Sequence, residues 1–386
     1  MRGWGRGVRR GFASWYNNRS GLSLAKQVTK YAQRDGWSHL DVLRLAHVNP
    51  RTDDHDAIFS HIAGKSKEVM ISDEVSAYMS AVDELKSATK VNDVVRLITD
   101  FEIPRELVPT QFLNETKVWE ALLPHMKPEA TIRNLGKMTS IGLLSPMSDA
   151  QKMVVARLQD TENLLAARIH PINVLSAQRV YSSGRGEKGS LSWTPNQKIV
   201  SALEDAFYGS FKTVEPTGKR RGIFLDISGS MGMYGSVVRG LTCREVTAVM
   251  AMVTVRTEED VIIKGFSNQL IDIKINEKMT LHEAINAVSG LPFGSTDPGL
   301  AIQWATKNRF ALDSFEILTD NEVNTGNHPV QLLRDYRKSV NPQAKMMVAA
   351  TMATNFTLAD PNDAGMLDIC AFDSAGPQIL ANFIRG

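Results

Sequence analysis

The sequence lacks an apolar run long enough to cross a bilayer. Its 386 residues are 43% hydrophobic and 22% charged, yet no apolar stretch approaches the ~18 residues that a membrane-spanning helix needs. This composition is typical of a globular protein, and at ~100–200 residues per domain the length accommodates two or three hydrophobic cores. We therefore expect no membrane partner.

Cysteine is scarce. Cys243 and Cys370 are the only two, and neither lies in a CxxC or Cys/His spacing, which argues against a zinc site or dithiol chemistry. Scarce cysteine fits a reducing compartment, and we expect the protein in the cytoplasm, with the nucleus as a second location.

Acidic residues are absent before Asp35, although the same stretch is rich in arginine. The start, "MRGWGRGVRRGF", lacks the apolar core of a secretory signal. Its composition leaves two interpretations open, an organelle transit peptide and a basic surface that meets RNA, and we favour the second.

Charge is divided along the chain. Residues 1–200 carry 27 Lys and Arg against 21 Asp and Glu, and the first fifty carry nine basic residues against two acids, whereas the whole chain has a net charge of only +2. This asymmetry predicts that the N-terminal part meets a polyanion. The alternative is a solvated surface without a partner.

Hydrophobic periodicity divides the chain at a similar place. Up to about Tyr208, apolar residues recur every three or four positions, as in Leu24, Val28 and Tyr31. This spacing predicts an all-helical part, with pairs of helices stacked as a solenoid. After the Pro/Gly-containing linker "VEPTGKRRG", short apolar runs alternate with helical ones, which predicts a doubly wound, mainly parallel α/β sheet. We predict a helical domain over 1–213 and an α/β domain over 214–386.

Polar oxygen atoms gather where these predicted strands end. Asp226 closes the strand "GIFLD" and is followed by Ser228 and Ser230, while the strand "FEILT" runs into Asp320. In a doubly wound sheet, ligands bind outside the carboxyl ends of the strands. Thr296, in "FGSTDPG", supplies a fifth oxygen from a third loop.

These five side chains suit a hard divalent cation, magnesium above all, because it prefers a few carboxylates, neutral oxygens and retained water. Taken alone, Asp-x-Ser-x-Ser also fits a helix N-cap. The placement of Thr296 and Asp320 favours the metal. The predicted ligands are Asp226, Ser228, Ser230, Thr296 and Asp320.

Cations line a predicted helix from about Leu22 to Gln33. Lys26, Lys30 and Arg34 follow at spacings of four, which predicts one basic stripe with Leu24, Val28 and Tyr31 towards the core. A second helix, capped by Ser38, adds Arg44 and His47. We predict phosphate contacts for the cations. A solvated surface is the alternative for the lysines and arginines, and simple capping is the alternative for His47.

Arg9, Arg10, Trp15 and Tyr16 form a basic and aromatic cluster. Bases stack on such rings, although packing of Trp15 in the core is the favoured interpretation.

Other polar groups are predicted to be structural. His170 before Pro171 reads as a helix cap, and Asp360, Asp363 and Asp368 read as loop caps instead of a second metal site. "SSGRGEKGS" at 182–190 lacks the Lys-Ser/Thr of a P-loop and reads as a flexible basic turn.

Long stretches carry a resemblance. "DISGSM", "GST" and "TDNE" resemble the metal-ion-dependent adhesion site of von Willebrand factor A domains, whose five ligand positions match the residues above. "WYNNRSGLSLAKQVTKYAQRDGWSHLDVLRLAH", "RNLGKM", "ARIHPINVL", "FKTVEPTGKR" and "ADPNDAGMLDICAFD" resemble the Ro ribonucleoprotein family, which carries the TROVE module.

This resemblance implies a ring of HEAT-like helical repeats joined to a von Willebrand A domain. It also implies small noncoding Y RNAs as partners, a role in quality control of misfolded noncoding RNA whose single-stranded 3′ ends enter the ring, and RNA contact at Lys30, Arg34 and His47. Family members carry further helices before "MRGWGRGVRRGF", so we expect that a ring formed without them is open or closes differently.

Two functions follow from these patterns, and a third is disfavoured. The first is a non-enzymatic RNA-binding scaffold whose metal site accepts an acidic group from another protein. The second is a metal-dependent protein-interaction module without an RNA role. Metal-assisted phosphoryl transfer or nuclease chemistry is disfavoured because the sequence offers no general base beside the metal ligands.

Overall fold

The structure is a computed structural model that describes residues 4–65, 71–186, 189–233, 238, 240–289, 291, 295–320, 328–352, 358–370 and 376–386. Residues 187 and 188 of the predicted basic turn lie outside these ranges. The chain forms two compact units, Met1–Met126 with Ile141–Leu143, and Lys127–Ser140 with Leu144–Gly386. None of the helices in the described ranges is both long and apolar enough to span a membrane.

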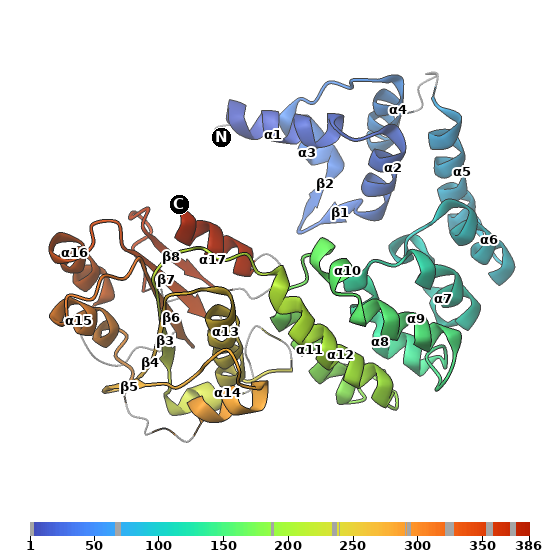
Figure 1. The fold of residues 1–386 in the computed structure, drawn as a ribbon. Helices are drawn as coiled ribbons and strands as arrows, with labels where there is room; N and C mark the ends of the chain where they lie inside the picture. The colour runs from blue at the N-terminus through green and yellow to red at the C-terminus, as the bar shows by residue number, and fades with distance from the viewer. Residues whose placement is uncertain are drawn as a thin grey trace. The chain divides into compact units, whose positions relative to one another are not determined.

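The first unit is mainly helical, as the three- and four-residue spacing predicts. Leu24 and Val28 of α2 are buried, and α2 packs against α4 and α5. The elements, drawn in blue to teal in Figure 1, are α1 (Arg6–Asn17), α2 (Gly21–Lys30), β1 (Gln33–Arg34), β2 (Trp37–Ser38), α3 (His39–Ala46), α4 (Asp53–Ile62), α5 (Asp73–Ser87), α6 (Val91–Phe101), η1 (Arg105–Leu107), η2 (Thr110–Asn114), α7 (Thr116–Leu122) and η3 (Leu123–His125).

A β-hairpin interrupts this helical unit, which the prediction of an all-helical N-terminal part missed. Strands β1 and β2 pair antiparallel, and the two residues between them, Asp35 and Gly36, both have positive φ, 51° and 80°. Two residues with positive φ form the turn that best fits the twist of a hairpin. The predicted helix from Leu22 to Gln33 therefore ends early, at Lys30.

In the described residues, the second unit begins with five α-helices and a short 3₁₀ helix, which run up to the linker. Helix α12 packs against α9 and α11, and α11 also packs against α8. The bounds are α8 (Pro128–Ser140), α9 (Asp149–Gln159), α10 (Thr161–Ala166), α11 (Pro171–Ser182), α12 (Gln197–Gly209) and η4 (Ser210–Thr213). The boundary predicted between 213 and 214 lies inside this unit, because α11 and η4 also contact α13 (Cys243–Thr257), the helix that follows the linker. The boundary stays a prediction.

A six-stranded sheet forms the remainder of this unit, in the order β5-β4-β3-β6-β7-β8, with only β5 antiparallel to its neighbour. This confirms the mainly parallel sheet. Its elements are β3 (Arg221–Asp226), η5 (Gly229–Gly232), α13 (Cys243–Thr257), β4 (Val261–Phe266), β5 (Leu270–Asp272), α14 (Leu281–Val288), α15 (Gly299–Lys307), β6 (Ser314–Thr319), α16 (Pro329–Ser339), β7 (Lys345–Ala350), β8 (Met366–Ile369) and α17 (Gly376–Arg385).

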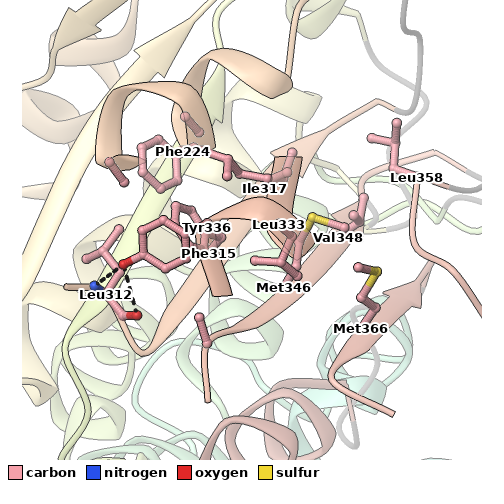
Figure 2. Close-up of a cluster of buried hydrophobic side chains, with 14 of the residues drawn as sticks. Phe224, Leu312, Phe315, Ile317, Leu333, Tyr336, Met346, Val348, Leu358 and Met366 are labelled. Carbon is pink, nitrogen blue, oxygen red and sulfur yellow. Dashed lines mark hydrogen bonds between the residues drawn. The ribbon is translucent and has the colours of Figure 1, made fainter. Parts of the chain in front are cut away.

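Helices cover both faces of the sheet, as a parallel sheet requires. Helices α15 and α16 lie on one face, and α13 lies on the other (Figure 1). Figure 2 shows the core under α15 and α16, where Phe315 of β6 packs between Phe224 of β3 and Tyr336 of α16, with ring centroids 5.9 and 4.9 Å apart. All six residues of β3 are buried, so this central strand fixes the position of whatever follows Asp226.

Candidate metal site and nucleic-acid interface

Asp226 is held in place where β3 ends. Its side chain is buried, with 2% of the residue exposed, and its Oδ1 accepts a 2.8 Å hydrogen bond from the backbone N–H of Ser228. The hydroxyls of Ser228 and Ser230 lie 3.0 Å apart. The turn after β3 thus brings these three predicted ligands together.

Asp320 follows the neighbouring strand β6. It is 1% exposed, and the hydroxyl of Thr319 beside it donates a 2.7 Å hydrogen bond to Asp226 Oδ2. The pKa of Asp226 is raised to about 6, mainly by burial and to a smaller extent by the negative charge of Asp320, against the lowering effect of hydrogen bonds from Ser228 and Thr319. Two buried carboxylates of like charge therefore share one site.

Thr296 lies on the other side of β3, in the loop tied to the end of β4. It is 2% exposed, and the next residue, Asp297, donates a backbone hydrogen bond of 3.0 Å to the carbonyl of Ser267. Because β4 and β6 flank β3 and run parallel to it, the three loops meet at one edge of the sheet. The five predicted residues lie on these loops.

The chemistry of this edge fits a hard divalent cation. All five side chains offer oxygen, and two of them carry charge. Among the described residues, no group of three or more His, Cys, Asp or Glu is placed to hold a metal, so a thiolate or imidazole site is not formed there. A cation with two positive charges would neutralise the repulsion between Asp226 and Asp320, and carboxylate with hydroxyl and water is the environment that Mg²⁺ prefers.

Two neighbours of this edge were missed by the sequence analysis. Thr319 orients Asp226, and Arg244, in the first turn of α13, donates a 3.3 Å hydrogen bond to the carbonyl of Ser228. Thr319 sits one residue before Asp320 at a strand end, which was a usable signal. Arg244 lies 16 residues from Ser228, and no local pattern indicates its contact.

The predicted basic stripe on α2 is only partly formed. Lys26 and Lys30 lie on α2, but Arg34 lies on β1 because the helix ends at Lys30. Tyr31 is the residue that caps the end of α2, with φ −118° and ψ 45°, and it is 40% exposed. The predictions that Arg34 shares the helical stripe and that Tyr31 faces the core are therefore wrong.

The two lysines of α2 have acidic partners. Lys26 Nζ lies 2.7 Å from Glu102, and Lys30 Nζ lies 3.6 Å from Glu106. Arg34 lies 3.6 Å from Asp35, but its side chain is 76% exposed, and so exposed an ion pair contributes little. Arg34 is thus the most accessible cation of the predicted stripe.

Helix α3 carries the next two predicted RNA contacts. Ser38 caps it, as predicted, in a reciprocal capping box with Asp41. Arg44 is exposed in its last turn, and His47 ends the helix in the left-handed region, with φ 51°. His47 caps the helix through its backbone N–H, which bonds Leu43, while the residue itself is exposed.

The predicted cluster on α1 is divided by burial. Arg10 is exposed and Arg9 is half-buried. Tyr16 is 1% exposed, and its hydroxyl is 2.7 Å from His39 Nδ1, so it belongs to the core and is not available to a base. Trp15 is 36% exposed, but the guanidinium of Arg19 lies 3.8 Å from its ring centroid.

The groups predicted to be structural are confirmed as such. His170 is buried, caps α11 by accepting a 3.2 Å hydrogen bond from Ile172, and burial lowers its pKa to about 3. Asp360 and Asp363 each accept a backbone hydrogen bond within their loop, from Asn362 and Gly365. Asp368 lies on β8 and accepts a backbone hydrogen bond from Leu358, ten residues earlier, so it is structural but the prediction that it is a loop cap is wrong.

Comparison with known proteins identifies relatives that share this architecture. Residues 220–384 match the family described as the Ro60 vWA domain, and residues 96–180 match the TROVE domain. The chain is 37% identical over 432 aligned positions to the RNA-binding protein RO60 of Caenorhabditis elegans, and 36% identical over 392 to that of Deinococcus radiodurans. The chain belongs to the Ro60 family.

The Ro60 relationship extends over the whole chain and confirms the predicted fold class, a TROVE helical region followed by a von Willebrand A domain. All of the chain aligns with both relatives, and it spans 66% of the C. elegans protein and 72% of the D. radiodurans protein. The crystal structure of the D. radiodurans RO (RSR) protein superposes with a TM-score of 0.83 at 33% identity, covering 100% of this chain and 78% of that one.

Proposed function

We propose that this Ro60-family chain is a non-enzymatic RNA-binding protein. The observation that carries the proposal is the alignment of the entire chain, at 36–37% identity, with two relatives named RNA-binding protein RO60. The nine basic residues among the first fifty support it independently, because cations that neutralise phosphates supply much of the affinity for nucleic acid.

The RNA class is a finer step of the same proposal. We infer small noncoding Y RNA, and misfolded noncoding RNA with single-stranded ends, as the bound species, in the cytoplasm and the nucleus. The sequence motifs shared with the Ro family support this choice. Exposed Arg34, Arg44, Arg10 and His47, all in the first unit, are the groups that we expect to contact RNA, with half-buried Arg9, Lys26 and Lys30 contributing less.

A salt series tests RNA binding. The Kd for a small structured RNA, measured by filter binding at several KCl concentrations, should rise steeply with salt, since each phosphate contact contributes about one to the slope of log K against log salt. Replacing both Arg34 and Arg44 with Gln should lower that slope by about two. Arg309→Gln, an exposed arginine of the second unit, is the matched control.

A flat and weak salt response would reject RNA binding and leave the alternative function, a metal-dependent protein-interaction module. An unchanged slope in the double variant would reject Arg34 and Arg44 as part of the RNA footprint.

We further propose that Mg²⁺ binds at Asp226, Ser228, Ser230, Thr296 and Asp320. Two buried carboxylates with three hydroxyl-bearing residues on adjacent loops support the assignment. When bound, the metal would offer an open coordination position to an Asp or Glu of a partner protein. Calorimetric titration with MgCl₂ should detect binding to the wild-type chain and none to Asp226→Ala, while Asp272→Ala, an exposed acid on β5, should bind normally.

A further inference from the structure

Two exposed aromatic rings stand beside cations in the first unit. Trp37 is 49% exposed and Tyr31 is 40% exposed. Large exposed aromatics are costly to leave in water, and here both lie within seven residues of each other, in the segment that joins α2 to α3.

The hairpin sets Trp37 beside Arg34. The two residues are cross-strand partners that flank the Asp35–Gly36 turn, so their side chains project from the same face of the hairpin. The side chain of Arg34 is 76% exposed. A planar ring for a base and a guanidinium for the adjoining phosphate thus stand next to each other.

A second pair repeats the arrangement at the end of α2. The Nζ of Lys30 lies 5.1 Å from the centroid of the Tyr31 ring. Because α2 ends at Lys30, Tyr31 leaves the buried stripe of the helix and is exposed. A cation and an aromatic ring again occupy neighbouring positions.

The neighbouring aromatic rings have structural roles. Trp4 stacks on Phe12, with centroids 4.7 Å apart, and its ring lies 5.8 Å from that of Trp37. Trp15 contacts Arg19 and stacks on His39. Trp4, which is itself half-buried, thus packs beside Trp37, while about half of Trp37 remains accessible.

Charge decides what kind of partner fits these rings. The first fifty residues carry nine cations and two acids, and both acids lie against neighbours of their own segment, Asp35 beside Arg34 and Asp41 in the capping box of α3. A surface in which rings alternate with cations suits a nucleic acid strand, because bases stack on rings and phosphates pair with cations.

We propose that Trp37 and Tyr31 stack on unpaired bases of RNA, with Arg34 on an adjoining phosphate and with Lys30, which is paired with Glu106, as a weaker second phosphate contact. This inference rests on the proposed RNA-binding function. It adds that this surface recognises single-stranded segments of the RNA. A base inside a duplex has both faces covered by its neighbours, so a blunt duplex would use the cations alone.

The test compares ring chemistry at one position. Trp37→Leu keeps apolar bulk against Trp4 but removes the aromatic face, whereas Trp37→Phe keeps a ring. We expect Trp37→Leu to weaken the binding of oligouridylate about tenfold, the effect of losing roughly one stacked base. Trp37→Phe, which keeps a ring, should bind oligouridylate almost as tightly as the wild type does. Binding of a blunt RNA duplex should be unchanged.

Salt dependence separates stacking from charge. Trp37→Leu should leave the slope of log K against log salt unchanged, while Arg34→Gln should lower it by about one. Leu45→Ala, at an apolar residue of α3 that is 37% exposed, is the control for general loss of apolar surface and should bind as the wild type does. Circular dichroism and the thermal midpoint establish that each variant is folded.

The outcomes distinguish this inference from the function on which it rests. A wild-type chain that binds neither RNA overturns both. Normal RNA binding by the wild type, with equal oligouridylate affinity in Trp37→Leu and Trp37→Phe, overturns the stacking alone. An equal loss of affinity for the RNA duplex in Trp37→Leu would also overturn the stacking. A change confined to self-association, measured by sedimentation, would overturn it too, and would identify these rings as a contact between proteins.

Discussion

Thr319 and Asp226 join two neighbouring strands at the candidate metal site. The hydroxyl of Thr319, at the end of β6, donates a 2.7 Å hydrogen bond to Oδ2 of Asp226, at the end of β3, while Ser228 N–H occupies Oδ1. Both oxygens of this buried carboxylate are therefore oriented by the fold. Such supporting hydrogen bonds commonly change metal affinity by ~10–100-fold when they are lost.

Thr319→Val removes that hydrogen bond at almost constant volume, and we expect it to weaken Mg²⁺ binding about tenfold in a calorimetric titration. Thr254→Val is the matched control, because Thr254 is also buried and its hydroxyl donates a hydrogen bond to the carbonyl of Met250 within α13. Equal Mg²⁺ affinity in the two variants would mean that Thr319 does not position a metal ligand.

A buried ion network at the opposite end of β3 gives a prediction about stability. Arg221 bonds Glu316 on β6 at 2.6 Å and Glu258 at 2.8 Å, and all three residues are buried. Although burial disfavours its charge, Glu316 and Glu258 raise the pKa of Arg221. Glu258, at the end of α13, also accepts hydrogen bonds from the backbone of Thr217 and Gly218, which ties the linker to the end of that helix.

Arg221→Met leaves two buried carboxylates without their cation, and we expect it to lower the free energy of unfolding by about 3–5 kcal/mol in urea titrations. Arg220→Met, at the adjacent exposed residue that pairs with Asp260, should cost less than about 1 kcal/mol. Similar losses of unfolding free energy in the two variants would contradict the claim that the buried ion pairs of Arg221 matter more for stability than the exposed pair of Arg220.

His170 makes stability depend on pH. Burial lowers its pKa to about 3, below the ~6.5 of an unfolded chain. Above pH 6.5 the residue is neutral in both states. As the pH falls from 6.5 towards 3, the unfolded state binds a proton that the folded state excludes, so stability is lost over that window.

His170→Asn keeps a side chain that caps helices well and removes the titration. Between pH 6.5 and 5 the wild type should lose about 1.5 kcal/mol more than this variant in urea titrations at each pH. Parallel losses of stability in the two proteins would show that protonation of His170 is not linked to unfolding.

The sequence was informative where local pattern determines structure. Asp226 and Asp320 were found because each directly follows a run of apolar residues that forms a buried strand, and the parallel order of those strands then brings their ends together. The start of helix α3 was predicted from Ser38, which forms a capping box with Asp41 in the structure.

Arg34 was misplaced because helical spacing was continued past the end of α2. The dipeptide Asp35–Gly36 is a hairpin signal. It indicates that the helix ends before Asp35 and that Arg34 and Trp37 lie on the two strands that flank the turn. The acidic partners of Lys26 and Lys30 could not be predicted from the residues near them in the sequence. Glu102 is 76 residues from Lys26 along the chain, so only the packing of the helices reveals that this cation is paired.

Those pairings lead to a prediction about RNA affinity. Glu102 and Glu106 hold Lys26 and Lys30, and the hydrogen bond and charge of Lys26 keep the pKa of Glu102 below its usual value. Glu102 is thus ionised at neutral pH and competes with phosphate for the same cation. Replacing both acids with Gln should free the two lysines and raise RNA affinity several-fold at low salt.

The gain should shrink as KCl is raised, and the slope of log K against log salt should steepen by up to about two, one for each lysine released. Glu84→Gln is the control, since Glu84 is an exposed acid of the same unit that pairs with Arg96. An equal gain from Glu84→Gln would indicate a general effect of net charge, because removing any acid would then favour a polyanion. A gain confined to the Glu102 and Glu106 variant would mean that the α2 lysines lie in the RNA footprint and that their acidic partners limit its affinity.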